Sequence, residues 1–384
     1  MEIFADLTSS GIYLSGETVK CQVTFFNTHE FHPESAQEKL EHLAWASVQI
    51  QCICQVANPR RESESSNLDS LTTSLQPQKD AFTSEVFATK PKILFCDLFL
   101  EPRESKMFEF EDSIPSSAPH SYNGRGLKYA YRLIVASQRL NQAISVLKIP
   151  FRVMSVASLN LDDFGSHDNQ EKQVNPSITN PFLMTENKDS VDKSSSSILN
   201  LLQEPSARRV ATFYDVRNSK GRVGRLCLFK TSFRLGEDVV GLFDFAEAES
   251  QCMQYSVSLY CEEQVKEAKK AKVILKQSSQ EFSYGYDQTN FSLPIPLHST
   301  PTFQDENCAL DWMLRFEFVI SAGSEPISKQ PLLDEKSTEG HEWNGPAHCQ
   351  VETMTWNLPI KVLPTNPNQV ANVLNIQTQY SMMI

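Results

Sequence analysis

One alternating segment occurs twice in this sequence, and this duplication constrains the fold more than any other feature. Residues 13–25 read YLSGETVKCQVTF, and residues 233–245 read FRLGEDVVGLFDF. When the Gly-Glu pairs at 16–17 and 236–237 are aligned, both copies continue with apolar residues at alternate positions. A period of two is typical of a β-strand with one buried face. The two segments are therefore predicted to be the same strand of two related domains.

Four further pairs of segments match in the same order, as a true internal repeat requires. They are ASVQIQC (46–52) with YSVSLYC (255–261), IPSSAPHSY (114–122) with IPLHSTPTF (295–303), YAYR (129–132) with WMLR (312–315), and LKIPFRV (147–153) with WNLPIKV (356–362). The distance between matched positions is 220 residues at the first pair, then 209, 181, 183 and 209. Each change predicts a loop insertion, and the polar segments 28–42, 58–80 and 323–348 can hold the larger ones.

Short alternating runs recur along both halves, and long helical periodicity is almost missing. The runs are VKCQVTF (19–25), VQIQCICQV (48–56), YAYRLIV (129–135), LKIPFRV (147–153), CLFKTSF (227–233), YSVSLYC (255–261), LRFEFVI (314–320) and LPIKVL (358–363). Many short strands separated by Pro, Gly, Asn and Ser are typical of an all-β sandwich. We predict an all-β chain with two tandem β-sandwiches, at 1–160 and 209–366.

The segment between the two predicted sandwiches, 161–208, is too polar and irregular to bury a core, so we expect a partly disordered linker there. Its end, SILNLLQEP, places Ile198, Leu201 and Leu202 before a proline and predicts one or two amphipathic helical turns. Residues 367–384 are expected to form a flexible tail.

The charge of the chain argues against nucleic acid as a partner. The sequence has 384 residues with 47 Asp and Glu against 35 Lys and Arg, which gives a net charge of −12. Such a chain repels phosphate backbones. No basic segment followed by an apolar run opens the sequence, and its longest apolar candidate for a membrane span, ILFCDLFL, has eight residues and contains Asp97. We expect a cytosolic protein whose association with membranes is peripheral.

Sequence motifs for phosphate binding, nucleophilic catalysis or acid–base chemistry do not occur. The segments GRG (124–126) and GRVGRL (221–226) lack the residues of a phosphate loop and are expected to be turns. There is no Gly-x-Ser-x-Gly elbow. Asp244, Glu247 and Glu249 are clustered, but a solvated strand edge or loop is the simpler interpretation. We predict no catalytic site and no cofactor.

The candidate metal ligands are equally sparse. His29, His32 and Glu34 lie together, but a closed site needs four ligands, and no second cluster accompanies them. Cys52 and Cys54 share one face of a predicted strand, where core packing is the expected role. The nine cysteines are scattered, as in a cytosolic protein with reduced thiols.

One lysine-rich segment stands out in an otherwise acidic protein. It gathers Lys266, Lys269, Lys270, Lys272 and Lys276 within EEQVKEAKKAKVILKQ. The simpler interpretation is a solvated hairpin loop. The alternative is an electrostatic contact with an acidic partner or an anionic membrane, because several lysines together give a salt-dependent attraction.

Several of these segments resemble known families. PSSAPHSYNGRGLKYAYRL and FSLPIPLHSTPTF are similar to the arrestin-fold signature, in which proline-spaced strands lead into an aromatic and then an alternating strand. LAWASVQIQC, KPKILFCDLFLEP, GRVGRLCLFKTSFRLGEDVVG, FSLPIPLHSTP and LPIKVLPTNP resemble the Rgp family, in order from near the start to Pro367. The linker and the loop after Asn58 do not carry the resemblance. At LEPRESK the resemblance leads us to expect Gly in the turn after Pro102, where this chain has Arg103.

The resemblance implies two arrestin-like, immunoglobulin-like sandwiches and a role in membrane traffic. The Rgp family is the smaller subunit of the Ric/Rgp exchange complex, which acts on a Golgi Rab GTPase of the Rab-six class. The implied partners are the larger Ric subunit, the Rab in its GDP-bound or nucleotide-free form, and the surface of the Golgi membrane. Nucleotide exchange needs no nucleophile, only tighter binding to the nucleotide-free GTPase than to the loaded one.

Two other functions remain open at this stage. An arrestin-type cargo adaptor outside any exchange complex would have the same architecture, although the Pro-Pro-x-Tyr peptides of many such adaptors do not occur here. A catalytic β-sandwich enzyme is the second alternative. As anchors for the larger subunit we single out apolar residues of the polar linker: Phe182, Leu183, Ile198, Leu201 and Leu202. Phe182 also ends an Asn-Pro-Phe peptide of the kind that trafficking domains bind. Packing between the sandwiches is the alternative role for these side chains.

Overall fold

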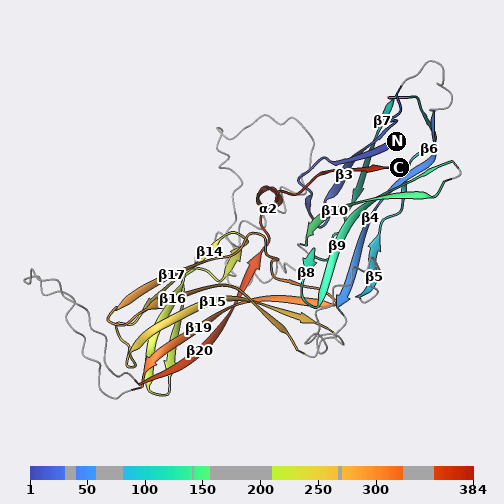
Figure 1. The fold of residues 1–384 in the computed structure, drawn as a ribbon. Helices are drawn as coiled ribbons and strands as arrows, with labels where there is room; N and C mark the ends of the chain where they lie inside the picture. Colours follow the sequence, from blue (N-terminus) through green and yellow to red (C-terminus); the bar gives the residue numbers. More distant parts are fainter. Residues whose placement is uncertain (31–39, 58–80, 141, 156–209, 267–269, 323–349) are drawn as a thin grey trace, which may run out of the picture. The chain divides into compact units, whose positions relative to one another are not determined.

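The computed structural model of the protein describes residues 1–30, 40–57, 81–140, 142–155, 210–266, 270–322 and 350–384. Within them strands predominate, and the described part of the chain has a single α-helix (Figure 1). The chain divides into two units, the first made of Met1–Pro205 and Pro364–Ile384, the second of Ser206–Leu363. The all-β class and the two tandem halves are confirmed.

Strands of the first unit form two sheets. The smaller has the order β21-β1-β3-β7, and the larger has the order β2-β10-β9-β4-β5, with β6 also paired to β4 and β8 to β9. The strands are β1 (Glu2–Leu7), β2 (Ile12–Leu14), β3 (Thr18–Phe26), β4 (Glu41–Ala57), β5 (Ala81–Ala88), β6 (Lys92–Leu100), β7 (Ser105–Ser113), β8 (Tyr122–Asn123), β9 (Leu127–Arg139), β10 (Ile144–Met154) and β21 (Gln379–Met383).

The second unit repeats this plan. Its smaller sheet has the order β11-β12-β14-β17, and its larger sheet has the order β13-β20-β19-β15-β16, with β18 paired to β19. The strands are β11 (Thr212–Asn218), β12 (Gly221–Leu228), β13 (Ser232–Arg234), β14 (Asp238–Asp244), β15 (Cys252–Val265), β16 (Lys272–Phe282), β17 (Gln288–Pro294), β18 (Phe303–Gln304), β19 (Cys308–Ser321) and β20 (Val351–Leu363).

Aromatic side chains fill the space between the two sheets of each unit. In the first, the Phe25 ring of β3 meets the Phe95 ring of β6 edge to face at 5.0 Å. In the second, the Phe243 ring of β14 lies 5.7 Å from the ring of Phe316 and 5.5 Å from that of Phe318, both on β19. Edge-to-face contacts at these distances are favourable beyond the burial of area.

The repeated Gly-Glu turn has the same geometry in both units. Gly16 and Gly236 have φ of 90° and 84°, which a residue with a Cβ adopts only at a cost. The following glutamate accepts a hydrogen bond from a backbone amide three residues earlier: Leu14 N to Glu17 at 2.7 Å, and Arg234 N to Glu237 at 2.9 Å. The glycine turns the chain and the carboxylate closes the turn, so both are required at this spacing.

A second shared feature corrects one pair of the predicted repeat. Tyr131 donates its hydroxyl hydrogen bond to Pro119 O at 2.5 Å, and Trp312 donates from Nε1 to Thr300 O at 3.1 Å. Each bond fixes the proline-spaced loop to the strand after it. Tyr131 therefore corresponds to Trp312, 181 positions later, and the expected distance of 183 at YAYR and WMLR was wrong by two.

Seven of the eight predicted runs lie within single strands, and the eighth is divided. CLFKTSF (227–233) begins in β12, which ends at Leu228, and finishes in β13, which starts at Ser232. The two strands belong to different sheets. The prediction of one strand was wrong because apolar and polar residues keep alternating where the chain leaves one sheet and enters the other.

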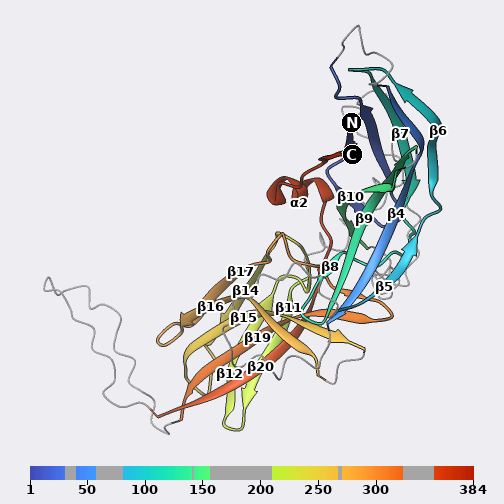
Figure 2. The same cartoon turned by 45° about the vertical axis from the view of Figure 1, so that its right-hand side comes forward.

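The expectation of a flexible C-terminal tail was also wrong. Residues after 366 form α2 (Pro367–Leu374) and then β21, which pairs antiparallel with β1. Asn366 caps the helix by accepting a hydrogen bond from Asn368 N at 3.0 Å. Figure 1 and Figure 2 both show the two ends of the chain side by side, and Ile384 N donates to Met1 O at 3.0 Å. The C-terminal strand covers the edge of β1, which would otherwise expose unpaired backbone groups.

Candidate interaction surface

The residues that the sequence proposed as partner anchors are not placed by the structure. Phe182, Leu183, Ile198, Leu201 and Leu202 all lie outside the described residues. Their role in binding the larger subunit therefore stays a prediction.

The lysine-rich segment is placed in part. Lys266 and Lys270 are exposed, and Lys272 begins β16, where it lies opposite Glu263 of β15. Lys269 lies outside the described residues. Most of the described part of the segment thus belongs to the paired strands β15 and β16 and not to a loop, because β15 extends to Val265 and β16 begins at Lys272. Its electrostatic contact with a partner stays a prediction.

The structure shows the neighbours of one candidate metal ligand, His29, and the burial of the cysteine thiols. His29 Nε2 lies 3.3 Å from a Glu41 carboxylate oxygen, and the described residues contain no cluster of three or more possible metal ligands. Cys52 and Cys54 are buried in β4, which confirms their expected place in the core. Burial, followed by the charge of Asp6, raises the pKa of the Cys21 thiol to about 12. A thiol held in this form is a poor nucleophile.

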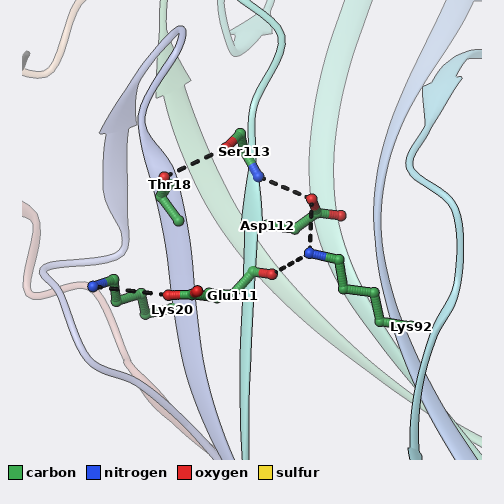
Figure 3. Close-up of a pocket in the computed structure, with 6 residues that line it drawn as sticks. All are labelled: Thr18, Lys20, Lys92, Glu111, Asp112 and Ser113. Carbon is green, nitrogen blue, oxygen red and sulfur yellow. Dashed lines mark hydrogen bonds and ion pairs between the residues drawn. The ribbon is translucent and has the colours of Figure 1, made fainter.

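A small polar pocket lies where the two sheets of the first unit meet. It is lined by Thr18, Lys20, Lys92, Glu111, Asp112 and Ser113 (Figure 3). Lys92 Nζ lies 3.2 Å from an Asp112 oxygen and donates to Glu111 O at 2.6 Å, while Lys20 Nζ lies 4.0 Å from the Glu111 carboxylate. Both ammonium groups have carboxylate neighbours. Since Lys92 is on β6 and Asp112 on β7, the ion pair joins the two sheets, and we assign the pocket a structural role.

A surface of a different kind covers the outer side of the larger sheet in the first unit. Ile93 on β6 and Ile144 and Val146 on β10 are 66%, 54% and 41% exposed. One row runs straight across four strands, because Val146 pairs with Ala136, Ala136 with Ser47, and Ser47 with Ile93. Figure 1 shows the same strands side by side in the order β10, β9, β4 and β6. We call this surface the outer β9 face.

The neighbouring rows extend the uncharged part of the outer β9 face. On one side Ile144 pairs with Gln138, which pairs with Trp45. The Trp45 Nε1 donates to Gln138 Oε1 at 2.9 Å, so these polar atoms satisfy each other. On the other side Ile134 of β9 pairs with Gln49 of β4. On β10, β9 and β4 the first two of these three rows contain no Asp, Glu, Lys or Arg, and the third contains one, Lys148, which pairs with Ile134.

The far end of the outer β9 face is basic. Lys128 and Arg132 on β9 and Lys148 and Arg152 on β10 point to the same side as Ile134 and Val146, since they stand at even spacing from them. The Arg132 Nε donates to Gln51 Oε1 at 2.7 Å, an uncharged partner. The described carboxylate nearest in register is Glu85 of β5, which accepts a hydrogen bond from Gln51 Nε2. Four basic residues thus face one acidic residue, in a chain whose net charge is −12.

The second unit has no apolar row at the equivalent positions. By the register of the repeat, Ala136 corresponds to Glu317 and Val146 to Thr355, and these two pair directly with each other. Ser47 corresponds to Ser256, whose hydroxyl lies 3.4 Å from a Glu317 oxygen. The same fold therefore carries polar residues at these positions in one copy, so the exposed aliphatic side chains at the equivalent positions of the other are not required by the architecture.

One pattern in the sequence indicates the outer β9 face, although no prediction was based on it. In AISVLKIPF the alternate set Leu147, Ile149 and Phe151 faces the core, yet Ile144 and Val146 on the opposite phase are apolar as well. A strand with apolar residues on both faces is typical of burial on both sides. The sequence could not show that Ile93 and Val146 lie in one row, because they reach the same surface only through the pairing of four strands.

Comparison with known proteins gives a consistent result over nearly the whole chain. The sequence profile of the Rgp1 family matches residues 4–167 and 156–321. The human protein named "RAB6A-GEF complex partner protein 2" is 35% identical over 388 aligned positions, which cover 96% of this chain and 95% of that protein. The bovine protein of the same name is 35% identical over 381 positions, 94% of this chain and 93% of its own length.

Proposed function

This chain belongs to the Rgp1 family, and from this premise we propose that it is one subunit of a two-subunit guanine-nucleotide exchange factor for a Rab GTPase of the Rab6 class. The observation that carries the proposal is the 35% identity to the human "RAB6A-GEF complex partner protein 2" over 96% of the chain. Similarity at this level along both units supports a shared role for the whole chain rather than for one domain.

The chemistry of exchange suits a protein built from two β-sandwiches. An exchange factor speeds GDP release by binding the nucleotide-free GTPase more tightly than the nucleotide-bound form. Each tenfold gain in release corresponds to about 1.4 kcal/mol of differential binding, which contacts across a protein interface can supply. Exchange therefore depends on surfaces that bind the GTPase, and the larger subunit supplies one of these surfaces besides the one on this chain.

We further propose that the protein moves between cytosol and Golgi membranes, where it binds peripherally as part of the complex and supports retrograde and intra-Golgi transport. Within the described residues no helix is long and apolar enough to cross a bilayer. Attachment would then come from the assembled complex and its GTPase.

The test is release of a fluorescent GDP analogue from a purified Rab6-class GTPase. Four reactions are compared: the GTPase alone, with this chain, with the larger subunit, and with both. We expect a large increase in rate only in the fourth. A GTPase of another Rab class serves as the specificity control, and an unchanged rate with both subunits would contradict the proposal.

The cargo adaptor outside an exchange complex is the second candidate, because an extended sheet surface such as the outer β9 face also suits a receptor tail. It makes a different prediction in the same experiment. An adaptor would bind membrane proteins from a Golgi extract, would not form a stable pair with the larger subunit, and would leave GDP release unchanged.

A further inference from the structure

We propose that the outer β9 face is the docking surface for the larger subunit of the exchange complex, and that this subunit presents an apolar centre with carboxylates along one side. The inference rests on the proposed function for the identity of the partner. Its chemistry comes from the surface itself, which is uncharged around Val146 and Ile93 and basic around Lys148 and Arg152.

Exposure of several aliphatic side chains on paired strands, rather than on loops, has to be explained by something that covers them. Ile93 is the second residue of β6, Ile144 and Val146 are the first and third of β10, and their exposed fractions range from 41% to 66%. Contiguous exposed apolar surface of this kind marks sites of protein association. Since Glu317 and Thr355 occupy the equivalent positions of the second unit, the fold itself accepts charge and hydroxyl groups there.

Charge complementarity identifies the kind of surface that fits. Lys128, Arg132, Lys148 and Arg152 form a positive border in a molecule with a net charge of −12. A partner with carboxylates opposite this border gains attraction there, and elsewhere it is repelled by the acidic remainder of the chain. The border therefore orients the partner, while the apolar rows supply the buried centre of the interface.

A membrane surface would be attracted by the same charges, but the arrangement favours a protein. Membrane-binding segments bury the apolar face of an amphipathic helix at the boundary of the lipid. Here the aliphatic residues alternate with the amides of Gln49 and Gln138 on an extended sheet. The Gln138 amide already accepts from Trp45 Nε1 and donates to Gln142 O. A protein partner can hydrogen-bond the amide of Gln49, whereas the hydrocarbon of a bilayer offers that amide no partner, at a cost.

The experiment measures association of the full-length chain with the purified larger subunit. In Val146→Asp a charge enters the uncharged row, and we expect the dissociation constant to rise on the order of tenfold or more, as for a central interface residue. The matched control is Thr355→Asp, the same change at the equivalent position of β20, which should bind like the wild type. Should Val146→Asp fail to fold, Val146→Thr introduces the second unit's residue and is expected to weaken binding less.

The basic border is tested separately. Lys148→Glu should slow association and reduce its dependence on ionic strength, because a border charge acts mainly on the encounter of the partners. The second unit's equivalent, Asn357→Glu, is the control. Equal association of the wild type, Val146→Asp and Lys148→Glu with the larger subunit would overturn the proposal.

Two parallel measurements separate this inference from its premise. Binding to vesicles of phosphatidylcholine and phosphatidylserine is compared for the wild type and Val146→Asp, and loss of vesicle binding with normal subunit association would make the face a membrane surface, contrary to the proposal. GDP release by the wild-type pair is read alongside. If the subunits associate through this face without stimulating release, the docking inference stands and the exchange function fails.

Discussion

At the scale of single residues, the turn at Arg103 shows a position where the sequence and the backbone disagree. Pro102 is followed by Arg103 with a φ of 67°, and Glu104 N donates to Glu101 O at 3.0 Å. Proline at the second position and a positive φ at the third are typical of a type II turn, in which glycine is preferred. The expected glycine conformation is therefore present although the glycine is not. For a residue with a Cβ this conformation costs roughly 1–2 kcal/mol.

Arg103→Gly is accordingly expected to stabilise the first unit, by about 1 kcal/mol once the greater entropy of unfolded glycine is subtracted. The lost ion pair to Glu30, 3.2 Å long and exposed on both sides, contributes little. Denaturant unfolding read by hydrogen exchange in β3 and β7 reports on this unit alone. Arg103→Ala removes the same ion pair but keeps the strain, so it should not stabilise. A glycine variant less stable than wild type would contradict the argument.

A buried histidine makes the stability of the first unit depend on pH. Burial, and then the charge of Arg152, lowers the pKa of His120 to about 3. Its Nδ1 accepts a hydrogen bond from Ser155 N at 3.1 Å, which requires the neutral ring. In the unfolded chain the pKa returns to about 6.5, so between these values only the unfolded state binds the proton. The contribution of His120 to the free energy of unfolding is complete above pH 6.5 and is lost as the pH falls toward 3.

We expect His120 to contribute a slope of about 1.4 kcal/mol per pH unit to the unfolding free energy between pH 4 and 6. His120→Asn keeps an acceptor for Ser155 N and cannot titrate, so its slope should be shallower by that amount. Unfolding of both proteins at several pH values in this range provides the comparison. Parallel curves for the wild type and the variant would show that His120 is not the titrating group.

At the scale of strands, the repeat was predictable in its order and its turns but not in every register. Shifting a strand by two residues keeps the same side chains on the same face, so YAYR and WMLR aligned plausibly with an error of two. The hydrogen bonds of Tyr131 and Trp312 to their loops fix the register. The strand pairing fixes it as well, since Arg132 lies opposite Pro150 and Met313 opposite Pro359. The pairing of β21 with β1 escaped prediction for another reason: local turn signals identify hairpins, and these strands lie at opposite ends of the chain.

The C-terminal strand provides a matched pair of substitutions that tests its role. Met382 is half-buried opposite the fully buried Ile3, whereas Met383 next to it is 67% exposed. We expect Met382→Asp to destabilise the first unit by about 1–3 kcal/mol and to speed hydrogen exchange in β1, since it places an unpaired charge against the core. Met383→Asp should change little. Equal effects of the two variants would mean that β21 does not pack as described.

At the scale of the whole molecule, the sequence predicted two sandwiches but not how the chain is divided between them. In the second unit, β11 precedes β12 and covers its edge, whereas in the first unit β21 from the far end of the chain covers β1. The boundary near residue 206 could be inferred from the polar segment before it. The return of Pro364–Ile384 to the first unit could not, because neither its composition nor its neighbours indicate a distant partner.

Because of this division, we expect the two units to differ in hydrogen-exchange protection when each is produced as an isolated fragment. Residues 206–363 form one continuous unit with its own edge strand, so this fragment should unfold cooperatively and retain the hydrogen-exchange protection it has in the full chain. Residues 1–205 lack α2 and β21 and should be poorly protected until a peptide of residues 364–384 is added. The same peptide with Met382→Asp is the control and should restore less. If residues 1–205 were fully protected without any peptide, the C-terminal segment would be an attachment to the first unit and not part of its structure.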